Sequence, residues 1–316
     1  GIFSHVFGGA EAGEILVKHL YVKAVGFTGS FAGGKQLFDW GNQRREPIPV
    51  FAEMGSVNPV FLLPGKINQS AEEIAKQYAA SITLGVGQFC TNPGIIIGID
   101  NADLQQFIKV LSSEIKNILP APMLHPGIYK SYVEKRAAAL SQQGVEQLAV
   151  AEKDAGLNEG TATIAATTAE NFINNPLLHQ EVFGPYSIII KCRDTNEMQQ
   201  VVKVLEGQLT SSIMATENDI LQNESLVESI KNICGRLILN SVPTGVEVCL
   251  SMQHGGPFPA TTDSRFTSVG ADGIKRFARP IAFQNWPDNL LPEELKNNNP
   301  FQIWRTVNNQ LTKKNI

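Results

Sequence analysis

Cys90 is the first residue whose type and surroundings suggest chemistry. It lies in Gly85-Val86-Gly87-Gln88-Phe89-Cys90-Thr91-Asn92-Pro93-Gly94, a predicted loop between a helix and a strand. Glycine and proline allow tight turns there, so backbone N–H groups can face a substrate beside the thiol. A small buried hydrophobic residue is the competing interpretation, and it fits a lone cysteine equally well. The other cysteines lie in or beside predicted regular elements and are interpreted as structural: Cys192, Cys234 and Cys249.

Two carboxylates are further candidates. Glu53 ends an apolar strand and precedes Met54-Gly55-Ser56, a turn that can hold the carboxylate partly buried. Burial raises the pKa of a carboxylic acid and makes it a usable base near neutral pH. Glu181 lies in Gln180-Glu181-Val182-Phe183-Gly184-Pro185, two residues from an aromatic ring and just before a Gly-Pro turn. A solvated strand-end charge and an ordinary loop acid are the alternatives that each residue leaves open when taken alone.

The segment Phe27-Thr28-Gly29-Ser30 joins a predicted strand to a predicted helix, with Ser30 as the helix N-cap. A helix N-terminus that follows a strand and a glycine is a natural cradle for phosphate, although many such turns look alike. The chain contains neither a Walker A pattern nor a GxGxxG fingerprint. The histidines show no metal-ligand spacing, and nothing in the sequence pairs one with Cys90: His5, His19, His125, His179 and His254. Each is interpreted as a surface or core residue, and no metal site is predicted.

Strands and helices alternate along most of the chain and must position these groups. Strands are predicted at residues 21–27, 47–53, 60–63, 95–99, 188–191, 211–216 and 236–240. Helices are predicted after Gly8-Gly9 and at residues 30–40, 71–84, 102–118, 126–143, 197–206 and 219–234. This order predicts an α/β fold with a mainly parallel sheet. After Pro280 the apolar periodicity is weak, so an arm or extended tail is predicted.

Composition sets the wider limits. The chain has 316 residues, which suggests about two domains, and a net charge of −4 that argues against a broad nucleic-acid or anionic-membrane footprint. No apolar run approaches the length of roughly 18–20 residues that a membrane span needs. The four cysteines form no CxxC pair, so a reducing cytoplasm is the expected location. The sequence begins Gly1-Ile2-Phe3-Ser4, without an initiator Met or a charged leader.

Four short blocks, taken in order and spacing, resemble the NAD(P)-dependent aldehyde dehydrogenase superfamily. They are Phe27-Thr28-Gly29-Ser30, Glu53-Met54-Gly55 with Asn58-Pro59, Gly87-Gln88-Phe89-Cys90, and Glu181-Val182-Phe183-Gly184-Pro185. The resemblance runs from about Gly8 to Phe277. The residues from Phe89 to Gly94 also look like the branch that contains NADP-dependent and 2,5-dioxovalerate (α-ketoglutaric semialdehyde) dehydrogenases.

The resemblance implies a role for each block. Cys90 would be the nucleophile that forms a thiohemiacetal and then a thioester, and its backbone N–H would supply part of an oxyanion hole. Glu53 would activate water for hydrolysis to a free acid. NADP or NAD would take the hydride; the choice between them stays open. The implied cofactor-binding residues are Gly29, Ser30, Met54, Gly55, Glu181 and Phe183.

The resemblance also implies a domain order. Residues 1–53 would be the C-terminal part of an incomplete Rossmann-like coenzyme domain, 54–262 the catalytic domain, and 263–316 a return segment ending in an arm. The segment that precedes these parts in relatives matches nothing here, so the chain is expected to be N-terminally truncated and poorly active, and the full-length protein to be a homo-oligomer. The substrate would be a small-molecule aldehyde, with no nucleic-acid or membrane partner.

The sequence also departs from the family pattern in two places. The usual Glu-Leu-Gly-Gly-Lys is Glu53-Met54-Gly55-Ser56-Val57, and a late Phe-Gly-Gly block is replaced by His254-Gly255-Gly256-Pro257-Phe258-Pro259, which leaves the aldehyde preference open. Two other functions stay open: a non-catalytic binding or assembly module with this fold, and a cysteine hydrolase of activated esters.

Overall fold

A computed structural model describes residues 2–316, which divide into two units, one ending at Arg276 and one running from Phe277 to Ile316. Among the described residues, no helix is both long and apolar enough to cross a membrane. The three-part division at residues 53 and 262 stays a prediction.

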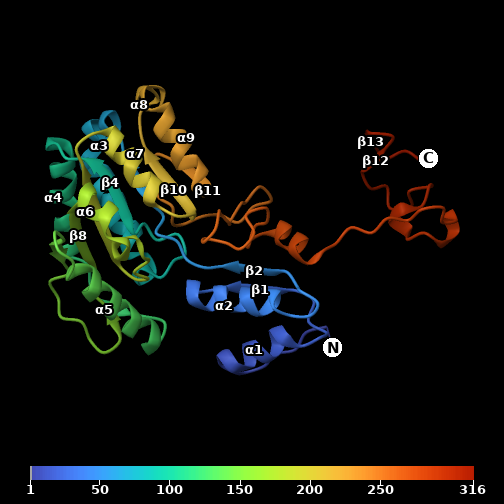
Figure 1. Cartoon of the computed structure of the whole chain (residues 1–316). Helices are drawn as coiled ribbons and strands as arrows, with labels where there is room; N and C mark the ends of the chain where they lie inside the picture. Colours follow the sequence, from blue (N-terminus) through green and yellow to red (C-terminus); the bar gives the residue numbers. More distant parts are fainter. Residues whose placement is uncertain (1) are drawn as a thin grey trace. The chain divides into compact units, whose positions relative to one another are not determined.

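A seven-stranded sheet forms the centre of the first unit (Figure 1). Its order is β11 (Cys234–Leu239), β10 (Gln208–Met214), β3 (Val60–Leu62), β4 (Ile95–Ile99), β9 (Tyr186–Cys192), β8 (Thr163–Thr168) and β6 (Glu146–Val150). All neighbours are parallel except β6, which runs antiparallel to β8. The predicted α/β class with a mainly parallel sheet is therefore confirmed. The sequence did not predict β6 and β8, because small residues such as Ala165 and Ala166 give β8 no strong apolar signal.

The central strands are continuously apolar because helices cover both faces of the sheet. Ile95, Ile97 and Ile188 pack on one side, in a cluster with residues of α5 (Pro126–Leu140), α6 (Ala169–Asn174), α7 (Thr195–Val204) and α9 (Glu224–Asn232). Ile96 and Ile189 pack on the other side, against α3 (Pro64–Thr83) and α4 (Ala102–Lys116). The helix predicted at residues 219–234 is two helices, α8 (Glu217–Gln222) and α9.

The N-terminal part of this unit is a small α/β layer. It consists of α1 (Ala10–Lys18), β1 (Val25–Thr28), α2 (Phe31–Asn42) and β2 (Val50–Glu53), with β1 and β2 parallel. Ser30 is the N-cap of α2, as predicted, because its hydroxyl accepts a hydrogen bond from the Gly33 N–H at 3.3 Å.

A late segment of the chain lies along the other side of β2. Glu53 forms an antiparallel bridge with Thr261, and the Ala52 N–H donates to the Thr262 hydroxyl at 2.9 Å. This contact brings residues 254–268 to the end of β2, about two hundred positions away in sequence.

The second unit contains a hairpin of β12 (Arg305–Val307) and β13 (Gln310–Thr312). The Arg305 guanidinium donates to the carbonyls of Lys296 at 2.6 Å and Asn297 at 2.7 Å, which holds the preceding turns against the hairpin.

Candidate active site

Glu53 is held at the end of β2 with its side chain only 4% exposed. Its carbonyl accepts a hydrogen bond from the Gly29 N–H at 3.0 Å, so the predicted phosphate turn and the predicted base are linked by the backbone. Its carboxylate accepts a hydrogen bond from the Ser268 hydroxyl and lies 3.3 Å from Nε2 of His254. The predicted partial burial of this carboxylate is confirmed.

Cys90 lies in the loop that follows a short turn, η1 (Leu84–Gly87). Buried Asn58 fixes this loop, because its Nδ2 donates to the Cys90 and Asn92 carbonyls, both at 2.9 Å. Asn92 Nδ2 donates in turn to the carbonyl of Gly184 at 3.1 Å. A Cβ at Gly87 would meet that same carbonyl oxygen at 2.3 Å, so only glycine allows the two loops to approach this closely.

His254 stands between the two predicted catalytic groups. Its Nε2 is 3.3 Å from Cys90 Sγ and 3.3 Å from Glu53 Oε1, and the three donor atoms all lie within 4.8 Å of one another. Its backbone is fixed because its N–H donates to the Thr267 hydroxyl at 2.9 Å and its carbonyl accepts from the Ser268 N–H at 2.8 Å.

No pattern in the sequence pairs a histidine with Cys90, yet the structure places the buried His254 in contact with the thiol. The two residues are 164 positions apart, and the bridge between β2 and Thr261 brings them together, so no local pattern links them. The signal that could have found His254 is its position at the start of the block that departs from the family's Phe-Gly-Gly. The prediction of no metal site stays a prediction.

The charges in this cluster stabilise one another. Burial would lower the pKa of His254, but hydrogen bonds to Cys90 and Glu53 outweigh it and raise the pKa to about 9. Burial would raise the pKa of Glu53, but the hydrogen bond and charge of His254 outweigh it, with help from Ser268 and Arg276, so the pKa is lowered. The predicted rise in the Glu53 pKa was therefore wrong, because the sequence did not reveal its cationic partner.

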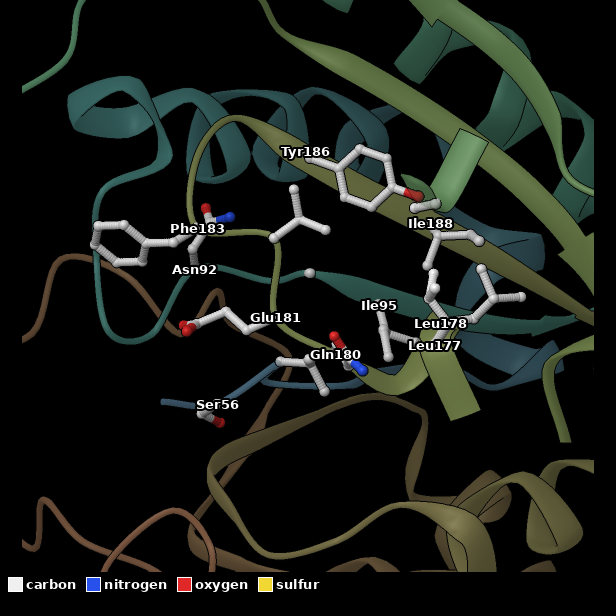
Figure 2. Close-up of a pocket in the computed structure, with 14 residues that line it drawn as sticks. Ser56, Asn92, Ile95, Leu177, Leu178, Gln180, Glu181, Phe183, Tyr186 and Ile188 are labelled. Atoms are coloured by element: carbon white, nitrogen blue, oxygen red, sulfur yellow. The ribbon is translucent and has the colours of Figure 1, made fainter. Parts of the chain in front are cut away.

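Glu181 lines a separate pocket, and Gly55 lies beside its carboxylate. Figure 2 shows Glu181, Phe183 and Ser56 toward one end of the pocket and apolar side chains, including Leu177, toward the other. Burial raises the pKa of Glu181 to about 7, partly offset by the charge of Lys135.

The backbone conformation and the surroundings of position 55 require glycine. Its φ is +107°, and a Cβ there would lie 2.8 Å from Glu181 Oε2. The structure thus brings together two of the predicted cofactor-binding residues.

The remaining predicted cofactor residues are placed at α2 and β2. Gly29 packs over the Phe27 ring, where a Cβ would meet the ring at 2.6 Å, and Ser30 is exposed at the α2 N-terminus. The Met54 side chain is 2% exposed and packs against Gly34 of α2, so it fills space between β2 and α2. The roles of these residues toward a cofactor stay predictions.

Comparisons with known proteins identify the family and the fold. Residues 1–266 match the model of the aldehyde dehydrogenase family. The α-ketoglutaric semialdehyde dehydrogenase of Acinetobacter baylyi is 42% identical over 313 residues, which are 99% of this chain and 59% of that protein. A second such enzyme, from Azospirillum brasilense, is 42% identical over 306 residues, 96% of this chain and 58% of that protein. The chain thus spans less than two thirds of the length of these relatives.

Solved structures share the fold. Proline utilization A from Bdellovibrio bacteriovorus matches with a TM-score of 0.72 and 20% identity, over 85% of this chain and 28% of that one. Succinic semialdehyde dehydrogenase from Streptococcus pyogenes, solved with NADP+, matches with a TM-score of 0.65 and 19% identity, over 81% of this chain and 55% of that one.

Proposed function

Because the chain belongs to the aldehyde dehydrogenase family, we propose that it oxidises an aldehyde to a carboxylic acid with NADP or NAD. The family resemblance and the fold expected from it are confirmed by the family match and the solved structures. The observation that carries the proposed activity is the convergence of the Cys90 thiol and the buried Glu53 carboxylate on one cluster.

A nicotinamide cofactor fits the residues that are present. Because Gly55 has no side chain, the Glu181 carboxylate packs directly against its backbone, and this carboxylate is proposed to accept a hydrogen bond from a ribose hydroxyl. The N-terminus of α2 offers Ser30 and backbone N–H groups to phosphate. Gly29, Ser30, Met54, Gly55, Glu181 and Phe183 are the residues proposed to hold the cofactor.

The cysteine and the carboxylate divide the reaction between them. Cys90 Sγ bonds to the aldehyde carbon, and the carbonyl electron pair moves to oxygen, where the Cys90 N–H is the proposed donor. The chemistry supplied by a bound nicotinamide is hydride acceptance, which leaves Cys90 as a thioester. Glu53 then accepts a proton from water while the water oxygen bonds to the thioester carbon. The C–S bond breaks, its electron pair returns to Sγ, and the carboxylic acid is released.

The proposed substrate is a semialdehyde such as 2,5-dioxopentanoate, and the names of the two relatives at 42% identity, both α-ketoglutaric semialdehyde dehydrogenases, support it. The net charge of −4 and the four free cysteines among the described residues support a cytoplasmic location and the lack of a nucleic-acid or membrane partner. A homo-oligomer is proposed on the family resemblance alone.

The test is aldehyde-dependent reduction of NADP or NAD by the purified chain. We expect Cys90→Ser to abolish reduction and Cys249→Ser, at an exposed free cysteine, to leave it unchanged. Reduction that persists in Cys90→Ser, or is absent from the unsubstituted chain with every semialdehyde tried, would contradict the proposal.

Two alternative functions of the chain predict different experimental results. A non-catalytic module would raise its melting temperature with nicotinamide but never turn over. The contact of His254 with Cys90 favours a cysteine hydrolase as the second candidate. Such an enzyme would cleave an activated ester catalytically without nicotinamide, and Cys90→Ser would abolish that cleavage.

A further inference from the structure

His254 contacts both reacting groups, yet the proposed reaction gives it no role. The ring is 4% exposed, and its backbone is fixed by Thr267 and Ser268. A buried imidazole with two hydrogen-bonding partners is held in one orientation, so its charge acts at a fixed point.

A single nitrogen makes both contacts. Nε2 lies 3.3 Å from Cys90 Sγ and 3.3 Å from Glu53 Oε1. A hydrolase triad differs, because there the carboxylate and the nucleophile bind opposite ring nitrogens. The single Nε2–H can therefore donate to the sulfur or to the carboxylate, and it forms the stronger hydrogen bond with whichever acceptor carries the negative charge.

We propose that His254 is a catalytic residue whose protonated Nε2 stabilises Cys90 Sγ as the attacking and leaving thiolate and turns to Glu53 while the sulfur is acylated. The inference rests on the proposed role of Cys90 as the nucleophile. The raised pKa of His254, about 9, agrees with a ring that stays protonated at neutral pH.

Charge and protons balance without a transfer from His254. In the attacking state that we propose, Sγ is a thiolate and Glu53 a carboxylate, and the two share the Nε2–H. In the thioester, sulfur has no charge, so the hydrogen bond passes to Glu53. During hydrolysis Glu53 takes the water proton and becomes neutral as Sγ regains its electron pair, and the Nε2–H returns to Sγ. Glu53 then releases its proton to solvent.

Other charged groups face this cluster and must be accounted for. Arg236 of β11 acts on Cys90 through its charge, and its guanidinium donates to the Pro243 carbonyl at 3.1 Å. Arg276 acts on Glu53, and Glu181 feels the charge of Glu53. Among the described residues, His254 is the one whose side chain contacts Sγ of Cys90 at hydrogen-bonding distance.

The first experiment needs no variant, aldehyde or nicotinamide. Iodoacetamide alkylation of Cys90 is followed by mass spectrometry of its peptide, in native protein and in urea. The alkylation rate of an unpaired thiol falls about tenfold for each pH unit below the thiol pKa, which is near 8.5. We expect the alkylation rate of Cys90 in the native protein to change less than about threefold between roughly pH 6 and pH 8. In the unfolded chain the rate should follow the steep dependence. A native profile as steep as the unfolded one would overturn the proposal, whatever the enzyme's activity.

The second experiment assigns the effect to the ring. His254→Gln keeps an N–H donor but removes the charge, and we expect at least a tenfold loss of Cys90 alkylation near pH 6 with recovery above about pH 9. His179→Gln is the matched control, because partly buried His179 bonds the Phe172 carbonyl at 2.7 Å instead of the cluster. The melting temperature of each variant reports folding. An unchanged pH profile in folded His254→Gln would contradict the role of His254.

Discussion

Asn58 is predicted to be the residue that holds the nucleophile loop in place. It is fully buried, its Nδ2 donates to the Cys90 and Asn92 carbonyls, and its Oδ1 accepts from the Thr210 hydroxyl at 2.9 Å. The residue also has φ +46°, a conformation that asparagine tolerates better than alanine.

Asn58→Ala removes the donor from both carbonyls and the acceptor from Thr210. An orphaned buried polar group costs about 1–3 kcal/mol. The Asn92 carbonyl is buried and incurs this cost in full, whereas the partly buried Cys90 carbonyl incurs less. With about 1 kcal/mol more for alanine at positive φ, we expect the free energy of unfolding to fall by about 2–5 kcal/mol.

Asn58→Asp separates hydrogen bonding from packing. Aspartate has nearly the same shape, but it presents an acceptor where the Cys90 and Asn92 carbonyls need a donor, and it buries a charge. We expect Asn58→Asp to destabilise more than Asn58→Ala. Urea unfolding measures both, and exposed Asn68→Ala is the control, expected to change stability by less than about 0.5 kcal/mol. If Asn58→Asp is as stable as the unsubstituted protein, the interpretation of Asn58 as a hydrogen-bonding anchor fails.

Three further predictions concern the carboxylates and Gly55. Glu53→Gln should give one reduced nicotinamide per site in a stopped-flow burst, followed by turnover slowed about 10²–10⁴-fold, because thioester hydrolysis loses its base; an unchanged steady rate would argue against that role. Gly55→Ala should weaken NADP binding, measured by calorimetry, since the new Cβ strains φ +107° and meets Glu181 Oε2; unaltered affinity would contradict the proposed cofactor contact. The Glu181 pKa is raised from 4.5 to about 7, so the folded state binds the proton more tightly than the unfolded chain and stability should fall as pH rises between those values. Glu181→Gln should flatten that fall in melting temperature, and an equally steep curve would refute the assigned cause.

The sequence predicted a structural feature correctly where that feature depends on residues only a few positions apart. Ser30 caps α2 as predicted, because an N-cap depends on one side chain and the N–H three positions later. Strand β4 was predicted with its observed bounds, since it lies between two helical layers, four of its five residues are buried, and its sequence forms one apolar run. The strands β6 and β8 were missed because most of their residues are small or polar, so neither strand gives a strong apolar signal.

The sequence by itself determined the α/β class, the family and the identity of Cys90, Glu53, Gly55 and Glu181 as candidates, because those signals lie in short blocks. Only the tertiary structure decided that His254 joins Cys90 and Glu53, since that contact depends on a backbone bridge between β2 and Thr261. The same contact reversed the expected direction of the Glu53 pKa, because a pKa depends on every charge nearby in space.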